Sequence, residues 1–208
     1  MCRKCLDGIV PHRAPLCPCC GRFFEGSGGD HLCGSCLDEP PAFSLHRSAG
    51  RYGAVLKDAL LLLKFRGCRP LAGELAAFAR EALRREEGLW WEADRLVPVP
   101  LHRRRLRERG FNQAAVIAGE IGRLTGIGVE RRALKKIRAT AAQTSLERHE
   151  RRANVRGAYA VPDPERIRGK VVLLVDDVFT TGATIRECAG VLRKAGAKDV
   201  RALTVAQA

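Results

Sequence analysis

The sequence predicts an α/β fold, a mostly parallel sheet with flanking helices, preceded by a small N-terminal zinc ribbon. Two observations support this prediction. The segment 171–205 reads as strand, loop, helix and strand, the pattern of a parallel βαβ unit. Seven of the nine cysteines lie before residue 37, so the first residues form a separate cysteine-rich unit. We expect the ribbon to occupy residues 1–41 and the α/β domain residues 42–208.

Hydrophobic periodicity predicts the elements in chain order. Apolar residues recur at helical spacing in the segments 55–65, 71–83, 113–125 and 184–195. Short aliphatic or β-branched runs predict strands at 96–100, 171–175 and 200–205. The segment 134–154 is polar and charged, and 162–170 reads as a loop. In this arrangement two helices precede the first strand.

Composition narrows the class of protein. The chain has 208 residues, 46% of them hydrophobic and 29% charged, which is typical of a globular protein. The longest apolar runs fall far short of the roughly 18 residues of a membrane-spanning helix, and no signal peptide is visible. We therefore expect a cytoplasmic protein without membrane insertion. In that reducing compartment, clustered cysteines usually bind metal.

The formal net charge of +14 predicts a polyanionic partner. Basic residues cluster around 103–109, 131–138 and 148–156. The residues expected to contact single-stranded DNA are Arg103, Arg104, Arg105, Arg107, Arg148, Arg151 and Arg152. Aromatic residues make up only 5%, with Phe111 and Tyr159 the nearest candidates for stacking on bases, so we expect weak, sequence-tolerant and salt-sensitive binding. The alternative is a solvated, arginine-rich surface.

Four cysteines are the candidate metal ligands. They form two CxxC pairs, Cys17 with Cys20 and Cys33 with Cys36. Each pair forms a turn that directs two thiolates at one ion, and four thiolates favour tetrahedral zinc. Such a closed site has no position for a reactive water, so its zinc is structural; the alternative is a cluster of free thiols. The roles of Cys2, Cys5 and Cys19 stay open.

The segment 171–184 carries the candidate ligand site. A buried strand leads to Asp176 and Asp177, and a threonine-rich loop with Gly182 leads into a helix. Ligands of open parallel sheets bind at the carboxyl ends of strands. Backbone amides at the start of the helix suit a phosphate, whereas carboxylates repel it and suit sugar hydroxyls or Mg²⁺. The segment therefore predicts a sugar phosphate as ligand.

This segment resembles the phosphoribosyl diphosphate (PRPP) motif of type I phosphoribosyltransferases: hydrophobic residues, two acids, two arbitrary residues and Thr-Thr-Gly-x-Thr. The resemblance implies that Asp176 and Asp177 hold the ribose. It also implies that the 5′-phosphate is held by Thr180, Thr181, Gly182, Ala183 and Thr184.

Further segments are similar to the ComF family over nearly the whole chain. They are the N-terminal cysteine pairs and the segments 63–67, 97–101, 109–114 and 143–154. The resemblance implies PRPP or phosphosugar binding with magnesium, a role in DNA uptake and competence, and a DNA-uptake helicase as partner. The alternative is an active phosphoribosyltransferase that moves phosphoribosyl from PRPP to a nitrogen nucleophile in nucleotide or cofactor metabolism. Turnover and the acceptor stay open.

Three cations are candidate ligands of the diphosphate. Lys64 and Arg66 lie just before Gly67, and the alternative reading is a helix end whose negative pole favours cations. Arg109, together with Asn112 and Gln113, is expected to meet the diphosphate or an acceptor base through paired hydrogen bonds. The alternative for Asn112 is a helix cap.

Overall fold

The computed structural model describes residues 3–11, 15–26, 28–140 and 148–208. Its centre is a five-stranded parallel sheet with the strand order β1-β7-β6-β2-β3. The strands are β1 (Leu45–Arg51), β2 (Arg95–Pro98), β3 (Gly128–Val129), β6 (Val171–Phe179) and β7 (Asp199–Gln207). The predicted α/β class with a mostly parallel sheet is confirmed.

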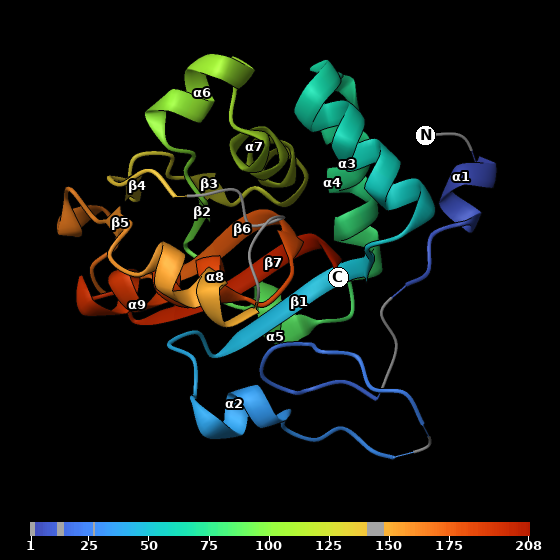
Figure 1. Ribbon diagram of the computed structural model, residues 1–208, viewed down its shortest axis with the longest axis horizontal. Helices are drawn as coiled ribbons and strands as arrows, with labels where there is room; N and C mark the ends of the chain where they lie inside the picture. The colour runs from blue at the N-terminus through green and yellow to red at the C-terminus, as the bar shows by residue number, and fades with distance from the viewer. Residues whose placement is uncertain (1–2, 12–14, 27, 141–147) are drawn as a thin grey trace.

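Helices cover both faces of this sheet (Figure 1). One face carries α3 (Ala54–Arg66), α4 (Pro70–Ala82) and α7 (Gln113–Thr125). The other carries α8 (Arg148–Val155), α9 (Ala183–Lys194), the cysteine-rich segment and an antiparallel pair, β4 (Lys135–Lys136) with β5 (Tyr159–Ala160). The remaining elements are short: α1 (Arg3–Asp7), α2 (Gly34–Asp38), α5 (Glu87–Trp90), α6 (Arg103–Arg109) and the 3-10 turn Pro164–Arg166. Among the described residues, no helix has the length and apolar character needed to span a bilayer.

Strand β6 lies in the middle of the core. Its side chains alternate between the two faces, Val172 and Leu174 on the α9 face, Leu173 and Val175 on the α3, α4 and α7 face. Burial on both faces is what a continuous aliphatic run in a parallel sheet predicts. The strand therefore holds the segment that follows it in a rigid position.

Strand β1 corrects the expectation that two helices precede the first strand. It lies before α3 and pairs in parallel with β7. Its sequence has no aliphatic run because His46 and Ser48 are buried polar residues, and both contact the Thr204 hydroxyl, at 3.0 and 2.5 Å. Hydrogen-bonded polar side chains can occupy a core position, but they do not contribute to hydrophobic periodicity.

Other expectations need smaller corrections. The predicted helices match α3, α4, α7 and α9 closely, and Gly67 ends α3 in the left-handed conformation (φ 64°). The segment 103–109 is helical, and 134–154 contains β4 and part of α8. Strand β6 continues past Val175 to Phe179, because it remains paired with β7 as far as Gln207. The acidic pair therefore lies inside β6 and not after its end.

Candidate functional site

The acidic pair lies where the sheet edge is staggered. Strand β2 stops opposite Val175, where the Val99 amide donates its last bond to the Val175 carbonyl (2.9 Å). Beyond this point β6 is paired with β7 but no longer with β2, so Asp176 and Asp177 lie where one edge of β6 is unpaired. Their residues are nevertheless only 9% and 5% exposed. Two adjacent carboxylates are thus held in a largely enclosed position.

Lys64 reaches this pair from the last turn of α3 and forms an ion pair with the Asp177 Oδ2 atom. Burial opposes ionisation of both acids, but the Lys64 charge prevails at Asp177 and lowers the pKa of that carboxyl. Burial, followed by the negative charge of Asp177, raises the pKa of Asp176 well above its usual value. Lys64 therefore favours the ionised form of Asp177, while burial and the charge of Asp177 favour the protonated form of Asp176.

The loop after β6 begins at Thr180 and leads into α9. Gly182 adopts φ +77°, and a Cβ atom there would lie 2.5 Å from the Phe179 ring, so only glycine fits. Thr181 Oγ1 accepts a hydrogen bond from the Ala183 amide (3.4 Å). The predicted phosphate residues are therefore brought together at the start of α9, beside the acidic pair.

Further cations surround the pair. Arg109 donates to the Gln113 side chain (2.5 Å) and lies over the Phe65 ring, 5.5 Å from its centroid. Burial lowers the pKa of Arg109, while the charge of Asp177 acts in the opposite direction. The positive charge of Arg105 acts on Arg109 as well, so both residues lie near this site.

Lys136, predicted only as part of a basic cluster, lies near the acidic pair. Its Nζ donates to the Thr140 hydroxyl (2.7 Å) and lies 5.2 Å from the centroid of the Tyr159 ring. Burial lowers the pKa of Lys136, as does the nearby Arg105, whereas the charge of Asp176 raises it. Its neighbour Lys135 is exposed. The signal that separates the two lysines is their alternation on the short strand β4, which places one toward the core and one toward solvent.

Two of the residues predicted to bind the diphosphate, Asn112 and Arg66, have other roles or surroundings. Asn112 caps α7: its Oδ1 accepts from the Ala114 amide (3.0 Å) and its Nδ2 donates to the Val99 carbonyl (3.0 Å). The capping alternative therefore accounts for its side chain. Arg66 is exposed at the end of α3, while Lys64 points to the acids. One expected pair of cations thus divides into a site residue and a surface residue.

The arginines expected to contact DNA are mostly on the surface. Arg103, Arg104 and Arg107 are exposed on α6, and Arg152 is exposed on α8, where it pairs with Glu39. Arg151 is partly buried on α8, Arg105 is exposed on α6, and the side chain of Arg148 and the segment 141–147 lie outside the described residues.

The prediction that Phe111 and Tyr159 are available to stack on bases is wrong. Phe111 and Tyr159 are 8% and 5% exposed, because both pack into the core clusters. Phe65 is instead 71% exposed, and the guanidinium of Arg109 lies near its ring. The sequence signal for it was the Lys64-Phe65-Arg66 run at the end of a helix, which placed one aromatic between two cations.

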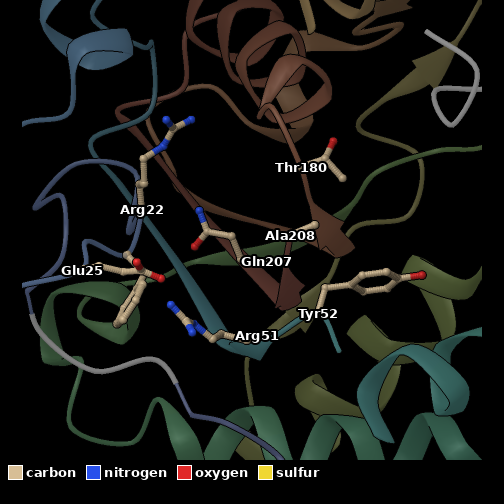
Figure 2. A pocket seen from close by; sticks show the side chains of 8 residues that line it. Arg22, Glu25, Arg51, Tyr52, Thr180, Gln207 and Ala208 are labelled. Atoms are coloured by element: carbon tan, nitrogen blue, oxygen red, sulfur yellow. The ribbon is translucent and has the colours of Figure 1, made fainter. Parts of the chain in front are cut away.

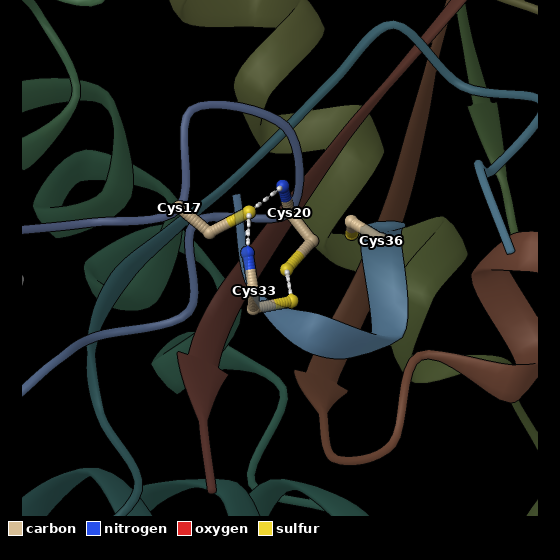
Figure 3. Close-up of side chains that lie close together, drawn as sticks. All are labelled: Cys17, Cys20, Cys33 and Cys36. Carbon is tan, nitrogen blue, oxygen red and sulfur yellow. Dashed lines mark hydrogen bonds between the residues drawn. The ribbon is translucent and has the colours of Figure 1, made fainter. Parts of the chain in front are cut away.

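The four predicted cysteines converge on one point (Figure 3). Their sulfur atoms lie within 4.8 Å of one another, and all four residues, Cys17, Cys20, Cys33 and Cys36, are buried. The sulfur of Cys17 accepts bonds from the amides of Cys20 (3.5 Å) and Cys33 (3.4 Å). Such amide donors stabilise a thiolate, and four convergent sulfurs suit tetrahedral zinc. The cluster therefore fits the predicted metal.

The four thiols have different surroundings, and these shift the pKa of one cysteine down and the pKa of others up. Burial would raise the pKa of Cys17, but the amides of Cys20 and Cys33 outweigh it and bring the pKa to about 7. Burial raises the pKa of Cys36 to about 12 and also raises the pKa of Cys20. Four neighbouring sulfurs cannot all be ionised without a cation, so a divalent metal is the natural counter-charge. Cys19 and Cys5 are not among the four, and Cys2 lies outside the described residues.

Known proteins with similar sequences identify the family. Residues 108–208 match the model of the phosphoribosyl transferase domain. The chain is 33% identical over 195 residues to the DNA utilization protein YhgH of Salmonella typhimurium, covering 92% of this chain and 84% of that protein. It is 31% identical over 199 residues to Competence protein F of Haemophilus influenzae, covering 93% and 85%. The chain belongs to the ComF family.

Streptococcus pneumoniae has another relative of this ComF-family chain, Competence protein ComFC, 31% identical over 165 residues and covering 77% of this chain and 67% of that protein. The family assignment and the sheet agree, since the matched phosphoribosyl transferase domain includes β6, the loop after it and α9. The acidic pair and the threonine-rich loop thus belong to the matched domain.

A hollow flanks the loop of this ComF-family chain at the ends of β1 and β7 (Figure 2). It has a volume of about 450 Å³ and is bounded by the ends of β1 and β7 and by the cysteine-rich segment. Its polar lining includes both cations and an acid: Arg22, Glu25, Arg51, Tyr52, Thr180 and Gln207. The Arg51 guanidinium lies 3.6 Å from the centroid of Phe23. Thr180 therefore borders both this hollow and the loop.

Proposed function

We propose that this ComF-family chain binds PRPP, or a related phosphosugar, together with Mg²⁺ at the carboxyl end of β6. The observation that carries the proposal is the buried acidic pair with its Lys64 counter-ion, directly before a glycine-dependent loop. Loop amides at the start of α9 suit the 5′-phosphate. Asp176 and Asp177 suit the ribose hydroxyls.

Magnesium fits the same residues. Carboxylate oxygens are its preferred protein ligands, and Asp176 and Asp177 offer them beside an open edge of the sheet. When bound, the ion adds positive charge where the diphosphate collects. Lys64, which pairs with Asp177, would offer its ammonium to a diphosphate oxygen bound beside the acids. Arg109, Arg105 and Lys136 supply further positive charge around it.

We also propose a contact with single-stranded DNA in DNA uptake or utilisation, in the cytoplasm and with an uptake helicase as partner. The names of the relatives support this role, as do the exposed arginines of α6 and α8. Phe65 supplies an exposed ring beside Arg109 on which a base can stack. Affinity then depends mainly on phosphate contacts and falls with salt. The zinc ribbon 1–41 and the α/β domain 42–208 are the two units of this proposal.

The hollow beside Thr180 favours a second function, phosphoribosyl transfer to a nitrogen nucleophile. In that reaction the nitrogen lone pair forms a bond to the anomeric carbon, the bond from that carbon to diphosphate breaks, and diphosphate leaves with the electron pair while the nitrogen releases a proton. The protein's part is to position the reactants and to stabilise charge. The site has the cations for the departing diphosphate and, in this hollow, space for an acceptor.

Calorimetric titration of the zinc-loaded protein with PRPP and Mg²⁺ tests the main proposal. We expect binding heat that disappears in the Asp176→Asn/Asp177→Asn variant and persists in Asp58→Asn, an exposed acid on α3 that serves as control. No heat in the folded wild-type protein would overturn the phosphosugar proposal. If PRPP binds, release of diphosphate in the presence of candidate acceptors would support phosphoribosyl transfer. No release with any acceptor would count against it.

A further inference from the structure

Arg186 joins the helix after the phosphate loop to the cysteine cluster. It lies in the first turn of α9, four residues after Gly182. Its guanidinium donates to the carbonyls of Glu39 (2.6 Å) and Ser35 (3.1 Å) and to the sulfur of Cys36 (3.4 Å). The planar fork of arginine suits several acceptors at once. One end of the loop is thereby tied to α2, which carries a predicted metal ligand.

His46 makes a second connection, at the other end of the loop. Its Nδ1 donates to the carbonyl of Cys20 (2.7 Å), and its ring stacks on Phe179 with a centroid distance of 3.9 Å and an angle of 18°. The Phe179 ring in turn fills the space where a side chain at Gly182 would lie. His46 is completely buried, and its Nε2 is held by the Thr204 hydroxyl. It therefore cannot move without moving one of these neighbours.

We propose that Arg186 and His46 are positioning residues through which metal binding at the four cysteines orders the phosphate loop. The proposal rests on the proposed function in one respect, that the loop 180–184 holds a phosphate. The two connections reach the cluster at different turns, Cys20 on the first and Cys36 on the second. Metal that draws these turns together thus sets both ends of the loop.

The loop needs such external support. The capping residue of α9 is Gly182, which has no side chain, so among the described residues the first turn has only the long bond from the Ala183 amide to Thr181 Oγ1 (3.4 Å). The Phe179 ring occupies the space beside the left-handed backbone of Gly182 (φ +77°). The cysteine turns need support as well, because α2 has only five residues and no side-chain cap at its start. Each side therefore stabilises the other. If metal binding raises the affinity of the loop for a ligand by some factor, linkage requires that the ligand raise the affinity for the metal by the same factor.

Hydrogen exchange measured with and without zinc tests this coupling. On removal of zinc with a chelator, we expect exchange of the amides in 179–187 to rise about tenfold, the equivalent of about 1.4 kcal/mol. The amides of α7, on the opposite face of the sheet, should keep their exchange rates. Equal exchange of 179–187 in both states, with α7 unchanged, would overturn the proposal.

Variants of the zinc-loaded protein give the same test without removing the metal. Arg186→Gln and His46→Leu should each speed exchange in 179–187 several-fold and speed zinc release to a chelator. Arg193→Gln is the matched control, since Arg193 lies on the same helix but donates to the Ala197 carbonyl (2.8 Å), at the helix end remote from the loop. If the amides of 179–187 exchange equally fast in Arg186→Gln and Arg193→Gln, the proposal is wrong. This comparison uses zinc-loaded protein, so it still holds if the zinc-free protein unfolds as a whole and exchange in α7 rises.

A ligand titration separates this inference from the proposed function. PRPP with Mg²⁺ should slow zinc release from the wild-type protein but not from Arg186→Gln. Absence of PRPP binding in calorimetry, together with zinc-dependent loop exchange, would refute the phosphosugar function and leave the coupling intact. PRPP binding of equal affinity with and without zinc would refute the coupling and leave the phosphosugar function intact.

Discussion

Two sets of cations in this chain carry the same charge but differ in what surrounds them. Lys64 and Arg109 are partly buried, one paired with Asp177 and the other bonded to Gln113. Arg103 and Arg107 are exposed on α6, where solvent surrounds them. The charges are alike, but water and salt screen the exposed set far more strongly.

The difference shows that burial decides what each cation can do. A half-buried cation with a fixed partner is already oriented, so a small anion can bind it in one geometry. An exposed arginine adds a screened, mobile charge, which suits many phosphates of a polyanion and no particular one. The net charge of +14 combines both kinds, so it does not distinguish a phosphosugar site from a DNA surface.

Replacement of Lys64 should give the largest loss of stability. Lys64→Met leaves the buried Asp177 carboxylate without its counter-ion, and we expect the free energy of unfolding to fall by about 2–3 kcal/mol. Lys57→Met, at an exposed position of the same helix, is the control. Urea denaturation of the zinc-loaded proteins measures both. If both substitutions lower the free energy of unfolding by the same small amount, Lys64 behaves like a surface cation.

Asp176→Asn should stabilise the protein without ligand at pH 7, because it removes a carboxyl whose pKa burial and Asp177 raise. A raised pKa in the folded state means that this carboxyl favours folding at pH values below its unfolded pKa of about 3.9 and that this contribution is lost as the pH rises.

The stability difference between Asp176→Asn and the wild-type protein should therefore increase from about pH 4 toward neutral pH. Urea denaturation at several pH values measures it. A variant that is less stable than the wild-type protein throughout this range would contradict a raised pKa of Asp176.

Arg109→Lys tests whether orientation matters as well as charge. It keeps the positive charge but removes the planar fork that bonds Gln113 and lies over Phe65. We expect a stability loss of about 1 kcal/mol and an approximately tenfold weaker PRPP affinity. Thermal unfolding and calorimetry measure these quantities. Unchanged PRPP affinity would show that Arg109 acts as a simple charge.

The exposed arginines should have the smallest effect on stability and the clearest effect on DNA. The triple variant Arg103→Gln/Arg104→Gln/Arg107→Gln should change the free energy of unfolding by no more than about 0.5 kcal/mol in total. The slope of log affinity for single-stranded DNA against log salt should decrease by about 2. Fluorescence anisotropy at a series of salt concentrations measures it, with Arg84→Gln/Arg85→Gln as control. A slope unchanged in the triple variant would remove α6 from the DNA surface.

Much of the candidate site could be predicted because its signals are local. The cysteine pairs and the run from Val171 to Thr184 each carry their chemistry in consecutive residues. The partners of Asp177 could not be predicted in this way. Lys64 lies more than a hundred positions away in the sequence, and nothing in its own segment separates a helix-end lysine from a site residue.

The sequence by itself determined the α/β class, the four cysteines that converge and the loop that follows β6, since hydrophobic period, ligand spacing and glycine geometry act over short distances. Only the tertiary structure decided that β1 is a strand and that Phe111 is buried. It also decided that His46 and Arg186 connect the cysteines to the loop. These outcomes depend on contacts between distant segments, which form only when the chain packs.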